Sequence, residues 1–225
     1  RIPLQHRIGN GHVFSSAHID RQAATDMLLA NLDGAPLADP NHLAFKAGHR
    51  ARAWEKNVVA LGLAAGFLEP LESTSIHLVQ SGIARLLALF PDTAFRAVER
   101  DRFNAETERE YINIRDFLVL HYRASERDDS EFWRYCRNLE APDGLAEKVA
   151  MFRSSGRIIR ENNELFTEDS WLSVMLSQGV TPQSYHPAAW MLDAAETRER
   201  LAHIRGVIAQ TVHQLPTQAE FLHQN

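Results

Sequence analysis

The chain has 225 residues, of which 44% are hydrophobic and 24% charged. This is ordinary usage for a folded globular protein and excludes a disordered or fibrous one. The net charge of −5 mixes both signs along the chain, so nucleic acid is not an expected partner. No apolar run reaches the ~20 residues of a membrane span. A single cysteine fits a reducing compartment, and we expect a cytoplasmic protein that contacts no membrane.

The first part of the chain favours short strands and one helix. Residues 1–7 enter strand-like sequence without a methionine, so we expect a piece of a larger protein. Turn residues precede Gly11–Ser16, which suits a short strand. Asp20–Leu32 has apolar residues at helical spacing, with Asp20 as the cap. Phe45–Ala53 resembles a polar strand, and Asn57–Gly62 a buried one.

Helices dominate the rest of the sequence. After Ser73, apolar residues recur at helical spacing until Pro91 stops the pattern. The charged stretch Glu99–Glu110 is interpreted as a solvated helix face. Further helices are predicted over Ala105–Ser125, Ser130–Asn138, Gly144–Ser155, Ser170–Ser177 and Ala194–Gln214. With strands confined to the first ~60 residues, the fold class is α+β.

The junction between the strand at Asn57–Gly62 and the helix after Ser73 has the features of a ligand site. Glycine or alanine at positions 62 and 64–66 lets a flat ligand approach the backbone. The free amides of a helix capped by Ser73 or Thr74 favour an anion, and a halide is one such anion. Tight packing of the helix on the strand is the alternative explanation for the same small residues.

Two carboxylates, Glu69 and Glu72, flank a Pro-Leu pair just before this helix. They would complement the helix dipole or bond loop amides. Alternatively, a desolvated Glu72 beside an aromatic substrate would take a proton from the ring, a general-base contribution of roughly 10² to 10⁴ in rate. Both interpretations place Glu72 near a ligand.

The segment at 57–75, NVVALGLAAGFLEPLESTS, resembles the flavin-dependent tryptophan halogenases, whose hallmark in this region is EPLEST. Ile2-Pro3 resembles the end of the family's WxWxIP signature. The resemblance implies that Glu72 is the catalytic glutamate and that the backbone amides of Thr74 and Ser75 bind halide. It also places the flavin against the strand and loop, with Gly62, Ala65, Gly66 and Phe67 as the expected contacts.

The resemblance further implies a flavin-dependent halogenase that uses reduced FAD, O₂ and chloride or bromide, and that acts through hypohalous acid on an electron-rich aromatic such as an indole or tryptophan. A separate flavin reductase would supply the FAD in a transient encounter, and a homodimer is a compatible assembly. The short strands would complete a sheet of a flavin monooxygenase-like fold. Residues 1–91 would belong to the flavin-binding core and 92–225 to a helical substrate side. The half that carries GxGxxG and the catalytic lysine is not in this sequence, so the chain alone is expected to be inactive.

Other features bear on the substrate and on metals. Ser75 replaces the glycine of the well-known tryptophan halogenases, and together with Tyr185-His186-Pro187 it is similar to a branch that acts on free indoles or unidentified aromatics. Trp171 and Phe166 would stack on the substrate, although packing of Trp171 in a helical core is the alternative. The eleven histidines show no zinc-site spacing, so we expect no metal.

Two other functions stay open from the sequence. A flavin-dependent aromatic hydroxylase would share the flavin-facing strand and helix but would need neither Glu72 nor a halide site. A non-catalytic helical binding module would have no flavin partner at all.

Overall fold

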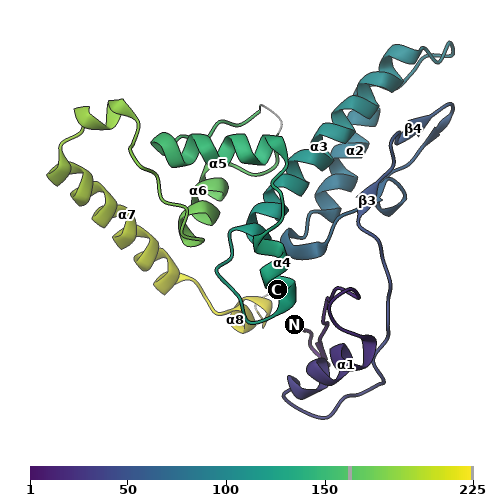
Figure 1. The fold of residues 1–225 in the computed structure, drawn as a ribbon, viewed down its shortest axis with the longest axis horizontal. Helices are drawn as coiled ribbons and strands as arrows, with labels where there is room; N and C mark the ends of the chain where they lie inside the picture. The colour runs from purple at the N-terminus through teal and green to yellow at the C-terminus, as the bar shows by residue number, and fades with distance from the viewer. Residues whose placement is uncertain (162–163, 224–225) are drawn as a thin grey trace. The chain divides into compact units, whose positions relative to one another are not determined.

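The computed structural model of the protein describes residues 1–161 and 164–223 (Figure 1). The chain forms two compact units. The first contains residues 1–150 and 158–181, and the second contains residues 151–157 and those from 182 onward. The boundary expected after residue 91 falls inside the first unit. The proposed division of the longer protein into a flavin-binding core and a helical substrate side stays a prediction.

The chain begins with a small hairpin. Strands β1 (Ile2–Pro3) and β2 (Ile8–Gly9) pair antiparallel. The strand expected at Gly11–Ser16 is wrong, because these residues form no strand. Instead, His12 Nδ1 lies 3.1 Å from the carbonyl oxygen of Ala24, so the segment packs on the following helix through a side chain rather than through a backbone ladder.

Helix α1 (Arg21–Ala30) confirms the first predicted helix. Its N-cap is Asp20, whose Oδ1 accepts a 2.8 Å hydrogen bond from the Ala23 amide. This bond satisfies one of the amides that a helix start leaves unpaired.

The remaining strands are shorter than expected. β3 (Gly48–His49) pairs with β6 (Gly66–Phe67), and β4 (Trp54–Glu55) pairs with β5 (Val58–Val59), both antiparallel. A strand does form within Asn57–Gly62, as β5, but the prediction that it is buried is wrong, since Val58 is 65% exposed. Strands also continue past the first sixty or so residues, because β6 lies beyond them.

The strands of the described residues form three separate two-stranded ladders. A ladder of this length holds only a few hydrogen bonds and depends on side-chain packing for its stability. Completion of a larger sheet therefore stays a prediction.

The helices carry most of the structure. α2 (Ser75–Ala88) lies where the apolar spacing placed it, and α3 (Ala97–Arg123) begins earlier than the expected Ala105. The early turns of α3 are rich in charge, which hid the buried positions Phe103 and Asn104 in the sequence pattern. The other helices are α4 (Glu131–Arg137), α5 (Asp143–Ser155), α6 (Glu168–Ser177), α7 (Ala194–Gln214) and α8 (Gln218–His223).

Three short 3₁₀ turns, η1 (Gly62–Ala64), η2 (Pro70–Glu72) and η3 (Pro187–Met191), complete the elements of the described chain. The first two lie between β5 and α2. Of the helices, none within the described ranges is long and apolar enough to span a bilayer.

Two clusters of buried side chains join α3 to the rest of the first unit. In one, the Trp54 ring meets Phe103 edge to face at 5.6 Å between ring centres. The buried side chain of Asn104 accepts a 2.8 Å bond from the Trp54 amide and donates a 2.9 Å bond to the Trp54 carbonyl, which fixes β4 against α3. In the other cluster, Leu78 of α2 packs with Tyr111, Ile114 and Leu118 of α3.

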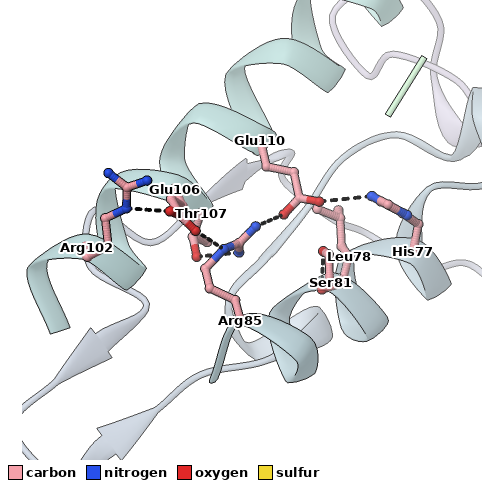
Figure 2. Close-up of polar contacts among 8 residues, drawn as sticks. All are labelled: His77, Leu78, Ser81, Arg85, Arg102, Glu106, Thr107 and Glu110. Carbon is pink, nitrogen blue, oxygen red and sulfur yellow. Dashed lines mark hydrogen bonds and ion pairs between the residues drawn. The ribbon is translucent and has the colours of Figure 1, made fainter. Parts of the chain in front are cut away.

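A polar network also ties α2 to α3, as Figure 2 shows. The Arg85 guanidinium donates to Glu110 Oε2 at 2.8 Å and to the Thr107 hydroxyl at 2.9 Å. His77 Nε2 lies 2.9 Å from the other oxygen of Glu110. Only 10% of the Glu110 side chain is exposed, so the expectation that Glu99–Glu110 is a purely solvated face is wrong at its last residue.

In the second unit, α7 is the main element. Its N-cap Asp193 accepts bonds from the amides of Ala195 and Glu196, both at 2.9 Å. The helix confirms the range expected from the sequence. The candidate site lies entirely in the first unit.

Candidate functional site

The segment between β6 and α2 carries the residues singled out by the sequence. It forms the turn η2 and then passes through Ser73, whose φ of 54° is in the left-handed region. A serine in this conformation costs of order 1 kcal/mol. Such strain persists where surrounding contacts fix the backbone, and it often marks a functional segment.

Helix α2 starts directly after Ser73. Thr74 is the N-cap and is 5% exposed, but its side chain makes no capping bond. The first rung of the helix is the 3.0 Å bond from the Leu78 amide to the Thr74 carbonyl, so the amides before Leu78 have no partner within the helix. The first turn contains no acidic residue. These donors and the helix dipole suit a small anion.

Glu69 anchors the turn to α3. Its Oε1 accepts a 3.2 Å bond from the Leu71 amide, and its Oε2 accepts a short bond from the Tyr122 hydroxyl. Burial, together with this carboxylate, raises the pKa of the Tyr122 phenol well above its usual value. The first of the two predicted carboxylates therefore has a structural role.

Glu72 contacts a different residue of α3, His121. Its Oε1 lies 3.0 Å from Nε2 of His121. The Glu72 side chain is 34% exposed and that of His121 is 16% exposed, so the carboxylate is half-buried while the imidazole is mostly enclosed. Sequence reasoning missed both His121 and Tyr122. The available signal was that His121 lies one turn after Phe117 and Tyr122 one turn after Leu118, both apolar residues.

An aromatic cluster continues from His121. The Phe117 ring lies 4.8 Å from the imidazole, edge to face, and stacks on Phe166 at 3.8 Å. Phe117 also meets Trp171 at 4.8 Å, edge to face. The structure thus places both predicted substrate-stacking residues in one cluster that reaches Glu72 through His121.

Trp171 is enclosed within this cluster. Its side chain is 1% exposed, and the Lys148 ammonium lies 5.2 Å from its ring centre. Its indole nitrogen is buried and has no hydrogen-bond partner within the described part of the chain. This burial agrees with the alternative to substrate stacking, in which Trp171 packs in a helical core. Stacking of a substrate on Trp171 or Phe166 stays a prediction.

The small residues expected to face a flavin are explained by internal packing. Gly62 has a φ of 56°, and a Cβ there would lie 2.9 Å from a methyl group of Val79. A Cβ on Gly66 would lie 2.7 Å from the Cβ of His49. Ala65 is 6% exposed and packs with Trp54. Tight packing of helix and strands therefore requires these residue types.

The turn η1 and the strand β6 also carry apolar side chains that are not fully buried. Leu63 is 73% exposed there, and the half-buried Phe67 packs edge to face on Phe45 at 5.0 Å. The sequence contains no GxGxxG turn for the cofactor's phosphates. These residues could therefore contact only the ring end of a flavin. Contact of that ring with Gly62, Ala65, Gly66 and Phe67 stays a prediction. Among the described residues, no group of three or more His, Cys, Asp or Glu side chains is placed to hold a metal ion.

Comparison with known proteins identifies relatives along the whole chain. A family model described as tryptophan halogenase matches residues 1–194. The solved structure of Xcc4156, a flavin-dependent halogenase from Xanthomonas campestris, is 48% identical, with a TM-score of 0.94, and the match covers 100% of this chain and 45% of that one. BrvH, a flavin-dependent halogenase from Brevundimonas sp. BAL3, is 43% identical over 94% of this chain and 43% of its own, with a TM-score of 0.88.

Among curated proteins, tryptophan 7-halogenase KtzQ from Kutzneria sp. (strain 744) is 33% identical, and the match covers 99% of this chain and 45% of that protein. The chain therefore spans less than half the length of the relatives it matches.

Proposed function

The chain belongs to the tryptophan halogenase family, and from this premise we propose that it is the part of a flavin-dependent halogenase that holds the halide and supplies the base. The observation that supports the proposal most is the start of α2. There, amides without a partner inside the helix and a half-buried carboxylate, Glu72, lie within one turn of each other. Halogenation of an aromatic ring by this route needs a bound halide to be oxidised and a base to take the ring proton, and this segment offers a candidate for each.

The reaction assigned to the whole protein joins an aromatic C–H and hypohalous acid to give a carbon–halogen bond and water. Gly62, Ala65, Gly66 and Phe67 would hold the ring of a reduced FAD delivered by a separate flavin reductase. Bound there, it would supply two electrons to O₂, the oxidant that converts chloride or bromide to hypohalous acid. The amides of Thr74 and Ser75 hold the halide. Glu72 takes the ring proton as the electron pair of the C–H bond returns to the ring, and this base contributes roughly 10² to 10⁴ in rate.

The substrate is an electron-rich aromatic such as an indole. KtzQ is named for tryptophan, whereas the names of Xcc4156 and BrvH give no substrate. Ser75 adds a side chain beside the proposed halide site. We therefore do not restrict the substrate to free tryptophan. Assembly as a homodimer stays a prediction.

The test is the substitution Glu72→Gln in the full-length protein, supplied with a flavin reductase, bromide and a panel of indoles. We expect brominated product to fall by about 10² to 10⁴ while the affinity for FAD is unchanged. Glu55→Gln is the matched control, because Glu55 is 58% exposed and pairs only with Arg52 at 2.9 Å among the residues described. Its turnover should equal that of the wild type.

Mass spectrometry of the products separates the alternatives. Unchanged bromination by the Glu72→Gln variant would reject the base. A hydroxylated product in place of a brominated one would identify an aromatic hydroxylase. Absence of both FAD binding and product would favour a binding module.

A further inference from the structure

The imidazole of His121 is held in one tautomer by the helix that carries it. Its Nδ1 lies 2.8 Å from the carbonyl oxygen of Phe117, one turn earlier in α3. A carbonyl oxygen only accepts hydrogen bonds, so Nδ1 must carry a proton. In a neutral ring the other nitrogen, Nε2, would then carry a lone pair and no proton.

That second nitrogen is the one that faces Glu72. A bare lone pair on Nε2 and an ionised carboxylate oxygen at 3.0 Å would repel each other. The contact is attractive only when a proton lies on one of the two atoms. An attractive contact therefore places a proton between Nε2 and Oε1, and it leaves Oε2 without one.

The position of the ring is also fixed. Besides the bond to the Phe117 carbonyl, the imidazole packs edge to face on the Phe117 ring, and only 16% of the side chain is exposed. Glu72 lies at the end of a short turn and is more exposed, so the histidine sets the carboxylate's position and not the reverse. Its Oε1 is engaged, which leaves Oε2 for a ligand.

A second His–Glu pair, between α2 and α3, shows what is particular to the pair formed by η2 and α3. His77 Nε2 lies 2.9 Å from Glu110 Oε1, but Glu110 Oε2 also accepts a bond from Arg85 (Figure 2). Both oxygens of Glu110 are occupied, one by a permanent cation. Among the hydrogen bonds and ion pairs of the described residues, the Glu72 side chain takes part in one, from Oε1 to His121, and Oε2 takes part in none of them.

We propose that His121 is the positioning residue for Glu72: it holds Oε1 so that Oε2 points to the substrate and receives the ring proton. This inference rests on the proposed function, in which Glu72 is the base. It adds a second residue to the site, one contributed by α3 rather than by the EPLEST segment.

The first test compares His121→Leu, His121→Gln and the matched control His77→Leu in the full-length enzyme. We expect His121→Leu to lower kcat by ~10- to 100-fold, as misplacement of a catalytic group does, with KM for the aromatic substrate and FAD affinity unchanged. The amide of His121→Gln can donate to Oε1 and should restore most of kcat. His77→Leu should keep wild-type kcat, because Arg85 still binds Glu110 and so still holds α2 against α3.

The second readout is independent of activity. In a long-range ¹H–¹⁵N spectrum of the full-length protein labelled at histidine, the His121 signals should show Nδ1 protonated. Glu72→Gln should shift the Nε2 signal of His121 and leave that of His77 in place, and Glu110→Gln should do the opposite.

The outcomes are distinguishable. If Glu72→Gln retains activity, the proposed base is wrong. If Glu72→Gln is inactive while His121→Leu keeps kcat, only the role of His121 is overturned. If His121→Leu does not fold, the wild-type spectrum and His121→Gln still decide, because a neutral ring protonated at Nε2 alone or a Gln variant as slow as Glu72→Gln would overturn the inference.

Discussion

Replacement of Arg85 by methionine tests whether the polar network holds α2, and with it the start of the candidate site, against α3. The guanidinium contacts Glu110 at 2.8 Å, the Thr107 hydroxyl at 2.9 Å and Glu106 at 3.3 Å. It also lies 5.8 Å from the centre of the Phe103 ring. Methionine keeps the length and the apolar stem of the side chain but removes the charge and every donor.

The size of the effect follows from burial. The side chains of Arg85 and Glu110 are 12% and 10% exposed, so the substitution leaves a nearly enclosed carboxylate whose remaining partner is His77. Removal of one member of a buried ion pair costs about 3 to 5 kcal/mol. Because His77 stays in place, we expect the lower end of that range, about 3 kcal/mol of unfolding free energy.

Urea unfolding of the full-length protein measures this loss. Hydrogen exchange of amides in α2 shows whether the loss is local to the helix. The matched control is Arg102→Met, which removes an arginine that pairs with Glu106 in the same network but is 64% exposed. A surface pair of this kind contributes about 0 to 1 kcal/mol, so the control should be close to the wild type.

A double substitution completes the test. Arg85→Met combined with Glu110→Gln removes both charges, so it should be less destabilising than the sum of the two single changes by about 1 to 3 kcal/mol. The interpretation is refuted if Arg85→Met loses no more stability than Arg102→Met. It is equally refuted if the two single changes are additive.

Two further predictions concern the contacts of β4 and of the EPLEST turn. Asn104→Ala leaves the amide and carbonyl of Trp54 without their buried partner, so we expect a loss of about 2 to 4 kcal/mol and faster hydrogen exchange at the Trp54 amide. The Tyr122 phenol, with its raised pKa, should stay protonated as pH rises past about 10, where free tyrosine ionises. Because the folded-state pKa is the higher one, the stability from the Tyr122–Glu69 contact is complete below about pH 10 and lost only as pH approaches the folded value. Ultraviolet absorbance of tyrosinate, compared between the wild type and Tyr122→Phe, checks this, and a Tyr122 signal that titrates near pH 10 would contradict it.

Helices were predictable where the pattern was local. The apolar spacing from Ile76 to Phe90 and the Asp20 cap each lie within a few turns of chain, and both α2 and α1 formed as expected. The start of α3 was missed because its first turns are charged, and only the packing of Phe103 on Trp54 shows that they are helical and partly buried. The strand at Gly11–Ser16 was wrong because a strand needs a partner, and the sequence does not show whether one is available.

The sequence by itself determined the family resemblance and the residues that we propose as the site from local geometry: Glu72, and the amides that follow Ser73. It could not assign different roles to Glu69 and Glu72, which share one short turn. The tertiary structure decided this by bringing Tyr122 to the first and His121 to the second. The physical reason is that a carboxylate's role depends on which oxygen is engaged and by what group. Here that group comes from a helix about fifty residues away, which no local periodicity encodes.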